Sequence, residues 1–136
     1  MDSEIIKSLI EKHIMDNNDI TIVTNIISNP QGYGRIVNYQ DGFKIVEENE
    51  LCESEKNIKE VNSGIFIGKK NVIKNLLEEI DNDNKDHEFY LTSIFKKATK
   101  KLQVGKIVYN NDYRLMGIND INTLKKMEQL FDKPFA

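Results

Sequence analysis

The chain has 136 residues, of which 39% are hydrophobic and 30% are charged, and its formal net charge is −3. This composition is typical of a globular protein of one domain, and it argues against a nucleic-acid-binding chain, which needs a basic excess to neutralise phosphates. No apolar run approaches the roughly 20 residues that a membrane span needs. Cys52 is the only cysteine, so an intramolecular disulfide is excluded and we expect a cytoplasmic protein.

The first third of the sequence predicts a helix, a buried strand and a hairpin. Asp2 or Ser3 can cap a helix whose apolar residues share one face, namely Ile5, Ile6, Leu9, Ile10 and Ile14. The β-branched run Ile20–Ile27 predicts a strand buried on both faces. After a loop rich in turn residues, Asp41-Gly42 predicts a hairpin between two short strands, Arg35–Tyr39 and Phe43–Glu47. A buried strand needs neighbours on both edges, and because few strands are available we expect an incomplete sheet.

The rest of the sequence continues the alternation of strands and helices. Ser54 can start one helical turn within the polar stretch Glu48–Lys59. The elements that follow are a strand at Val61–Ile67, a helix at Val72–Ile80, a helix from Thr92 or Ser93 to about Leu102, a strand at Lys106–Tyr109 and a helix at Ile121–Phe131. This order predicts a single α/β domain over residues 1–136 with a mixed sheet.

Several residues could bind a ligand, and each also has a purely structural explanation. The glycines of Gly32-Tyr33-Gly34 permit positive φ angles and a close approach of ligand to backbone, although a plain turn is the simpler explanation. Asn62 interrupts an apolar strand, so its amide must bond either to protein or to ligand. Glu47 ends a strand, where a solvated carboxylate is the simple alternative.

The same choice applies to two candidate helix starts and to the basic residues. Thr92 and Asn119 each precede a predicted helix, so each is either a cap or a ligand-binding group. His13 and His87 lie outside any cluster with metal-ligand spacing, which argues against a zinc site. A strip of lysines is interpreted as a solvated helix face, namely Lys96, Lys97, Lys100 and Lys101.

Taken together and in order, these segments resemble one family. The motifs are Asn-Pro-Gln-Gly-Tyr-Gly-Arg-Ile-Val at Asn29–Val37, Ile45-Val46-Glu47, Glu60–Ile65, Asn82–Ser93 and Gly117-Ile118-Asn119. Their sequences and spacing are similar to those of the uridyltransferase domain of the bacterial bifunctional N-acetylglucosamine-1-phosphate uridyltransferase/glucosamine-1-phosphate acetyltransferase. The resemblance covers nearly the whole chain, and it implies the sugar-binding half of a Rossmann-like (GT-A-like) nucleotidyltransferase fold.

The resemblance also implies a role for each motif. The reaction would convert UTP and N-acetylglucosamine-1-phosphate to UDP-N-acetylglucosamine and pyrophosphate, with Mg²⁺ as cofactor. Asn119 would supply a neutral oxygen to the Mg²⁺ ion, which prefers oxygen ligands. The residues expected to bind or line the sugar pocket are Tyr33, Gly34, Glu47, Asn62, Tyr90 and Thr92.

The family's N-terminal half carries the glycine-rich nucleotide loop and a second, acidic metal ligand, and neither motif occurs in this sequence. We therefore expect one of three proteins. The first is one half of a split or truncated enzyme, inactive alone and completed by an N-terminal half. The second is a non-catalytic relative that binds a sugar phosphate or a partner. The third is an interaction module, which could form a homo-oligomer.

Overall fold

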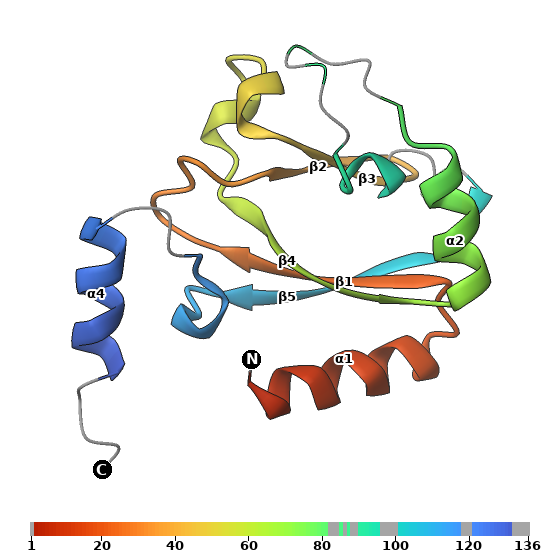
Figure 1. The fold of residues 1–136 in the computed structure, drawn as a ribbon, viewed down its shortest axis with the longest axis horizontal. Coiled ribbons are helices and arrows are strands. Elements are labelled where there is room, and N and C mark those ends of the chain that lie inside the picture. Colours follow the sequence, from red (N-terminus) through yellow and green to blue (C-terminus); the bar gives the residue numbers. More distant parts are fainter. Residues whose placement is uncertain are drawn as a thin grey trace.

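The computed structural model describes residues 2–81, 85, 87, 90–95, 101–117 and 121–131. It is an α/β structure in which one sheet has helix α1 on one face and helix α2 on the other (Figure 1). The helices are α1 (Ser3–Met15), α2 (Lys70–Glu78) and α4 (Ile121–Phe131). The strands are β1 (Ile20–Ile26), β2 (Arg35–Tyr39), β3 (Gly42–Val46), β4 (Glu60–Gly68) and β5 (Val104–Asn110).

The sheet has the order β3-β2-β4-β1-β5 and is mixed, as predicted. Strand β1 runs antiparallel to β4 and parallel to β5, so both of its edges are paired. The first six residues of β1 are buried, which confirms the prediction of a strand covered on both faces. Strand β2 meets β4 only at the pair Arg35–Val61. Over Ser63–Gly68, no strand in the described part of the chain pairs with the edge of β4 that is opposite β1. Because this observation covers the described residues alone, the incomplete sheet stays a prediction.

The alternating side chains of β1 enter two separate apolar cores. On the hairpin side, Ile20 and Ile22 pack with six other buried residues, namely Ile36, Phe43, Ile45, Leu76, Ile94 and Phe95. On the opposite side, Val23 packs against Ile5 and Leu9 of α1 and against Leu115. Each fully buried aliphatic or aromatic side chain contributes about 1.5–3 kcal/mol relative to an exposed one. The two cores hold the hairpin, sheet and α1 in fixed positions.

The structure corrects three details of the predicted elements. In the hairpin, Tyr39 pairs with Gly42, so the turn is Gln40-Asp41 and the glycine lies in the strand. Strand β5 is longer than predicted and includes Gly105. Only part of the predicted apolar face of α1 is buried, because the sheet contacts one side of the helix and leaves three residues exposed, namely Ile6, Ile10 and Ile14.

The other helical segments follow the predictions in part, since α2 begins and ends two residues earlier than the predicted Val72–Ile80. Asp2 caps α1 by accepting from the backbone N–H groups of Glu4 and Ile5. The polar stretch contains two 3₁₀ turns, Glu48–Glu50 (η1) and Glu55–Asn57 (η2), and a third, Tyr113–Leu115 (η3), follows β5. In the predicted helix that starts near Thr92, the described helical residues are 93–95 and 101. None of the described helices combines the length and apolar character that a membrane crossing requires.

Candidate functional site

The Gly32-Tyr33-Gly34 loop joins β1 to the hairpin and is held from within by Arg35. Gly32 has a φ angle of +87°, a conformation that favours glycine. The Arg35 side chain is almost fully buried, and its Nη1 group donates to the Tyr33 carbonyl and to Glu48 Oε2. A buried guanidinium requires such partners, because desolvation of an unpaired charge is costly. Arg35 therefore fixes the loop relative to the segment that follows β3.

Gly34 lies against Glu47 and against β4. Its carbonyl accepts a hydrogen bond of 2.9 Å from the Asn62 N–H. A Cβ atom at Gly34 would lie 3.3 Å from Ile45 Cγ2 and 3.6 Å from Glu47 Oε2. The first distance is tighter than ordinary van der Waals contact, so a side chain at this position would require the Ile45 side chain to shift by a few tenths of an ångström. A plain turn does not require this close contact.

The Thr92 hydroxyl donates a hydrogen bond of 2.6 Å to Glu47 Oε1, across 45 positions of sequence. The N–H groups of Ile94 and Phe95 donate to the main-chain carbonyls of Leu91 and Thr92. The Thr92 side chain is therefore directed at Glu47 and not at the start of its own helix. We call Gly34, Glu47 and Thr92 the loop site.

Tyr90 and Asn62 lie beside the loop site but use their side chains differently. The Tyr90 hydroxyl accepts a hydrogen bond of 3.3 Å from Asn49 Nδ2, next to the Glu47 segment. Asn62 Oδ1 accepts from the N–H of Gly64, whose φ angle is +82°. This local turn matches the structural alternative for Asn62. The backbone of Asn62 contacts the loop site, whereas its side-chain oxygen is bonded within β4.

The Tyr33 hydroxyl connects the loop to the segment after β5. It accepts a hydrogen bond of 3.0 Å from the Gly117 N–H and donates one of 3.3 Å to the Gly117 carbonyl. Asn119, the predicted magnesium ligand, lies outside the described residues, as do Lys96, Lys97 and Lys100 of the predicted lysine strip. In the described part of the chain, no three His, Cys, Asp or Glu side chains gather closely enough to hold a metal ion.

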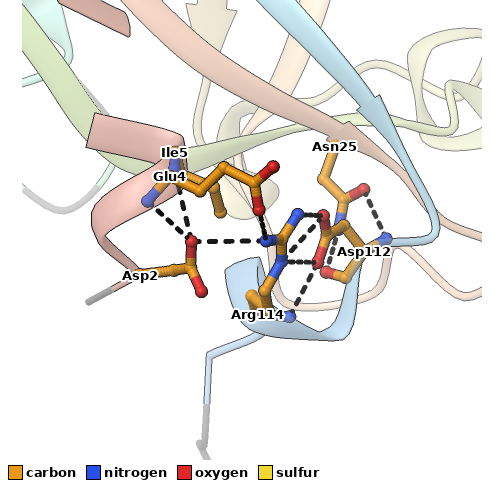
Figure 2. Close-up of polar contacts among 6 residues, drawn as sticks. All are labelled: Asp2, Glu4, Ile5, Asn25, Asp112 and Arg114. Atoms are coloured by element: carbon orange, nitrogen blue, oxygen red, sulfur yellow. Dashed lines mark hydrogen bonds and ion pairs between the residues drawn. The ribbon is translucent and has the colours of Figure 1, made fainter. Parts of the chain in front are cut away.

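A second polar group, which the sequence did not single out as a site, anchors the same segment. Asn25 of β1 is buried; its Nδ2 donates to the Asp112 carbonyl and its Oδ1 accepts from the Asp112 N–H. The Arg114 guanidinium binds the Asp112 carboxylate and also reaches Asp2 and Glu4 of α1 (Figure 2). We call Asn25, Asp112 and Arg114 the clamp. The sequence feature that could have indicated the clamp is Asn25, an amide side chain within a buried, mostly β-branched strand.

The clamp is electrostatically matched. The hydrogen bond from the Arg114 side chain is the main reason that the pKa of Asp112 lies below its ordinary value, and the backbone N–H of Arg114 acts in the same direction. Burial of the carboxyl opposes this shift without reversing it. Asp112 is therefore held as a carboxylate, and the segment that leads to Gly117 is fixed to both β1 and α1.

Comparison with known proteins agrees with this architecture. Residues 3–129 match the model of the nucleotidyl transferase family. The bifunctional protein GlmU of Thermosipho africanus is 39% identical over 126 residues, which is 93% of this chain and 27% of the relative. GlmU of Acetivibrio thermocellus is 40% identical over 121 residues, covering 87% of this chain and 26% of the relative. The chain thus spans about a quarter of the length of these curated relatives.

A solved structure supports the fold independently. A protein described as a glucose-1-phosphate thymidylyltransferase, from Bacillus anthracis, superimposes with a TM-score of 0.66 at 14% sequence identity. The match covers 96% of this chain and 51% of that protein. At this identity the similarity concerns the fold alone, whereas the family model spans nearly the whole sequence. The chain therefore belongs to the nucleotidyl transferase family.

Proposed function

We propose that this chain forms the sugar-phosphate side of a sugar-1-phosphate nucleotidyltransferase, and that its ligand is N-acetylglucosamine-1-phosphate. In this proposal the loop site binds the sugar, together with Tyr90 and the Asn62 region. Residues 1–136 would then be the sugar-binding half of a nucleotidyltransferase domain. Similarity to GlmU supports the choice of sugar, because the motifs that carry the resemblance include all these residues.

The observation that carries the proposal is the hydrogen bond between Thr92 and Glu47 beside the Gly34 backbone. Within the described residues, the Glu47 carboxylate accepts only this one hydrogen bond. An ionised carboxylate can accept about four, so Glu47 retains acceptor capacity for sugar hydroxyls or an N-acetyl N–H group. Thr92 binds Oε1 and so orients the carboxylate, and Glu47 is only partly buried.

This chemistry favours selection of a particular sugar. A site that hydrogen-bonds a hydroxyl or amide discriminates against an analogue that lacks this group, because a buried polar partner left unpaired costs about 1–3 kcal/mol. Glu47 can accept from the N–H of an N-acetyl group or from a hydroxyl at the same position, so the choice between the two sugars follows from the similarity to GlmU. We therefore propose that the chain binds N-acetylglucosamine-1-phosphate more tightly than glucose-1-phosphate.

For the complete reaction, an oxygen of the bound sugar phosphate attacks the α-phosphorus of UTP and pyrophosphate leaves. The loop site contributes by holding the sugar so that this oxygen is correctly placed, which lowers the entropic part of the barrier. We assign nucleotide binding to the part of the GlmU relatives that this chain does not match. That part would lie either on the same polypeptide or on a partner chain. A non-catalytic protein that binds the sugar phosphate is the alternative with the same loop site.

Magnesium belongs to the proposal through Asn119. An amide oxygen suits Mg²⁺, but it provides no charge compensation, and Mg²⁺ sites in proteins ordinarily include one or two carboxylates and substrate phosphates. The described residues supply no carboxylate cluster for this purpose. The described residues by themselves therefore do not fit a magnesium ion.

The proposal is tested by titrating the 136-residue chain with N-acetylglucosamine-1-phosphate, glucose-1-phosphate and inorganic phosphate in a calorimeter. We expect saturable binding of the first ligand and weaker binding of the others. Glu47→Gln keeps the shape of the side chain and removes its charge, and it should raise the Kd about tenfold or more, since hydrogen bonds to charged groups contribute about 1.5–3 kcal/mol.

The matched control is Glu11→Gln, which removes the same charge from an exposed position on α1, on the other face of the sheet. It should leave the Kd unchanged. Equal weakening by both variants would indicate a general charge effect and would contradict the assigned site. An absence of binding by the unmodified chain would remove the proposed function for this chain by itself.

A further inference from the structure

The hydroxyl of Tyr33 is already used within the protein. A tyrosine hydroxyl has one proton to donate, and that proton is directed at the Gly117 carbonyl, while the oxygen accepts from the Gly117 N–H. The Tyr33 ring lies 3.9 Å from where a Cβ atom of Gly117 would be. The side chain that the motif predicts to bind substrate is therefore engaged with a residue 84 positions away.

Gly117 follows a segment that is fixed on two sides. Asn25 holds the backbone of Asp112 from β1, and Arg114 joins the Asp112 carboxylate to the start of α1 (Figure 2). Turn η3 then leads from Asp112 towards Gly117, with Leu115 buried in the core beside α1. The segment from Asp112 to Gly117 is consequently a firm support for the Gly32-Tyr33-Gly34 loop.

The loop is held at two points, which have different partners. Arg35 donates to the Tyr33 carbonyl, and the Gly117 N–H donates to the Tyr33 hydroxyl. The next residue after Tyr33 is Gly34. Its carbonyl accepts a hydrogen bond from the Asn62 N–H, and a Cβ atom on Gly34 would lie close to Glu47. Because Tyr33 directly precedes Gly34, a displacement of the Tyr33 backbone also displaces the Gly34 backbone of the loop site.

We propose that Tyr33 is a positioning residue, whose hydroxyl bonds to Gly117 to place the Gly34 backbone for the sugar phosphate, and that it does not itself contact the sugar through this hydroxyl. This inference rests on the proposed function of the loop site. The proposal also links the order of the Gly34 backbone to the Tyr33–Gly117 hydrogen bond. A ligand that orders the Gly34 backbone should strengthen this hydrogen bond, because linked equilibria act in both directions.

The test uses Tyr33→Phe, which removes only the hydroxyl and preserves the ring. The first arm measures amide hydrogen exchange of Gly117 in the ligand-free chain by NMR. Loss of one hydrogen bond should accelerate this exchange about fivefold in the variant, as expected for a bond with a net contribution near 1 kcal/mol. The second arm adds N-acetylglucosamine-1-phosphate and measures both the Kd and the additional protection of the Gly117 amide.

The matched control is Tyr109→Phe, the same chemical change in β5, where the ring packs against the core beside α1. It should alter neither quantity. For Tyr33→Phe we expect about fivefold weaker binding and loss of the ligand-dependent protection that the unmodified chain shows at Gly117. A merely structural role would change the ligand-free exchange without changing the response to ligand.

Each other result overturns the proposal in a different way. Unchanged Gly117 exchange in the ligand-free variant would show that the hydroxyl does not hold this segment. Weaker binding with the ligand-dependent protection intact would show that Tyr33 contacts the sugar directly. If the unmodified chain binds no sugar phosphate, the proposed function fails and the positioning role fails with it, even where the ligand-free exchange responds as expected.

Discussion

The loop site and the clamp are both built from polar side chains that are distant in sequence, but they use their hydrogen-bonding capacity differently. In the clamp, the Asp112 carboxylate is bonded to the Arg114 side chain and backbone, while Asn25 occupies both backbone groups of Asp112. In the loop site, the structure records a single hydrogen bond to Glu47 among the described residues. The clamp is nearly saturated, and the loop site is not.

This difference separates a structural group from a candidate binding group. Saturated networks lower the cost of burying polar atoms and fix one arrangement of the chain. A carboxylate that is oriented by one neighbour, and otherwise uncommitted, can exchange water for ligand without breaking protein contacts. The clamp should therefore govern the free energy of unfolding, whereas the loop site should govern ligand affinity.

The largest expected effect comes from the clamp. Asn25→Ala removes two hydrogen bonds; among the described residues it leaves the Asp112 N–H without a partner, whereas the Asp112 carbonyl keeps its bond from the Leu115 N–H. We expect the free energy of unfolding to fall by about 2–4 kcal/mol, because the unpaired N–H costs about 1–3 kcal/mol and the second lost hydrogen bond adds about 1 kcal/mol. Urea denaturation followed by circular dichroism measures this change.

Asn71→Ala, at an exposed position of α2, is the control for Asn25→Ala. Exposed substitutions of this kind ordinarily change stability by no more than about 0.5 kcal/mol. Similar losses from the two variants would mean that the clamp has no special structural weight, and the contrast with the loop site would disappear.

A smaller effect, on ligand affinity and not on the free energy of unfolding, is expected in the loop site. Thr92→Val keeps the shape of the side chain and removes the hydroxyl that orients Glu47. The Kd for N-acetylglucosamine-1-phosphate should rise about fivefold, which corresponds to about 1 kcal/mol. Thr92→Ser retains the hydroxyl and should restore most of the affinity. Calorimetric titration of the three chains gives the comparison, and equal affinity of the Val and Ser variants would remove the assigned role of the hydroxyl.

The smallest effect is the dependence of stability on acid. The pKa of Asp112 is lowered from 3.8, chiefly by its hydrogen bond to Arg114, and that of Asp19 is lowered from 3.8, chiefly by its hydrogen bond to Lys69. A lowered pKa means that the folded state favours the carboxylate. The resulting stabilisation is fully present above the ordinary pKa and is lost as the pH falls through the folded-state pKa.

Urea midpoints measured between about pH 6 and about pH 2 should therefore decrease on acidification. Asp112→Asn should be less stable than the unmodified chain at the upper end, and the difference should shrink as the pH falls. A difference that is independent of pH would show that the ion pair between Asp112 and Arg114 does not contribute through charge.

The fold could be predicted to a large extent because its signals are local. The β-branched run at Ile20–Ile27 predicts a buried strand, and the cap at Asp2 predicts the start of α1; the structure contains both. The predicted face of α1 was partly wrong, because Ile6, Ile10 and Ile14 are as apolar as Ile5 and the sequence does not state how much of a helix the sheet covers. The hairpin turn was shifted by one residue for a similar reason, since pairing between Tyr39 and Gly42 selects it.

The candidate site divides in the same way. From the motifs, Gly34, Glu47, Asn62 and Thr92 could be expected near one another, and the structure places the Thr92 hydroxyl on Glu47 and the Asn62 N–H on Gly34. The direction of each side chain could not be predicted. Asn62 could bond to protein or to ligand, and Thr92 could be a helix cap or a ligand-binding group; the structure shows the Asn62 oxygen bonded within its own strand.

By itself, the sequence determined the order of helices and strands and the residues whose chemistry could recognise a sugar phosphate. These properties follow from periodicity, capping and residue type over a few neighbouring positions. Only the tertiary structure decided that Tyr33 meets Gly117 and that Asn25 holds Asp112, pairs separated by 84 and 87 positions. Such contacts depend on how the two cores pack against β1, and no local pattern in the chain encodes that packing.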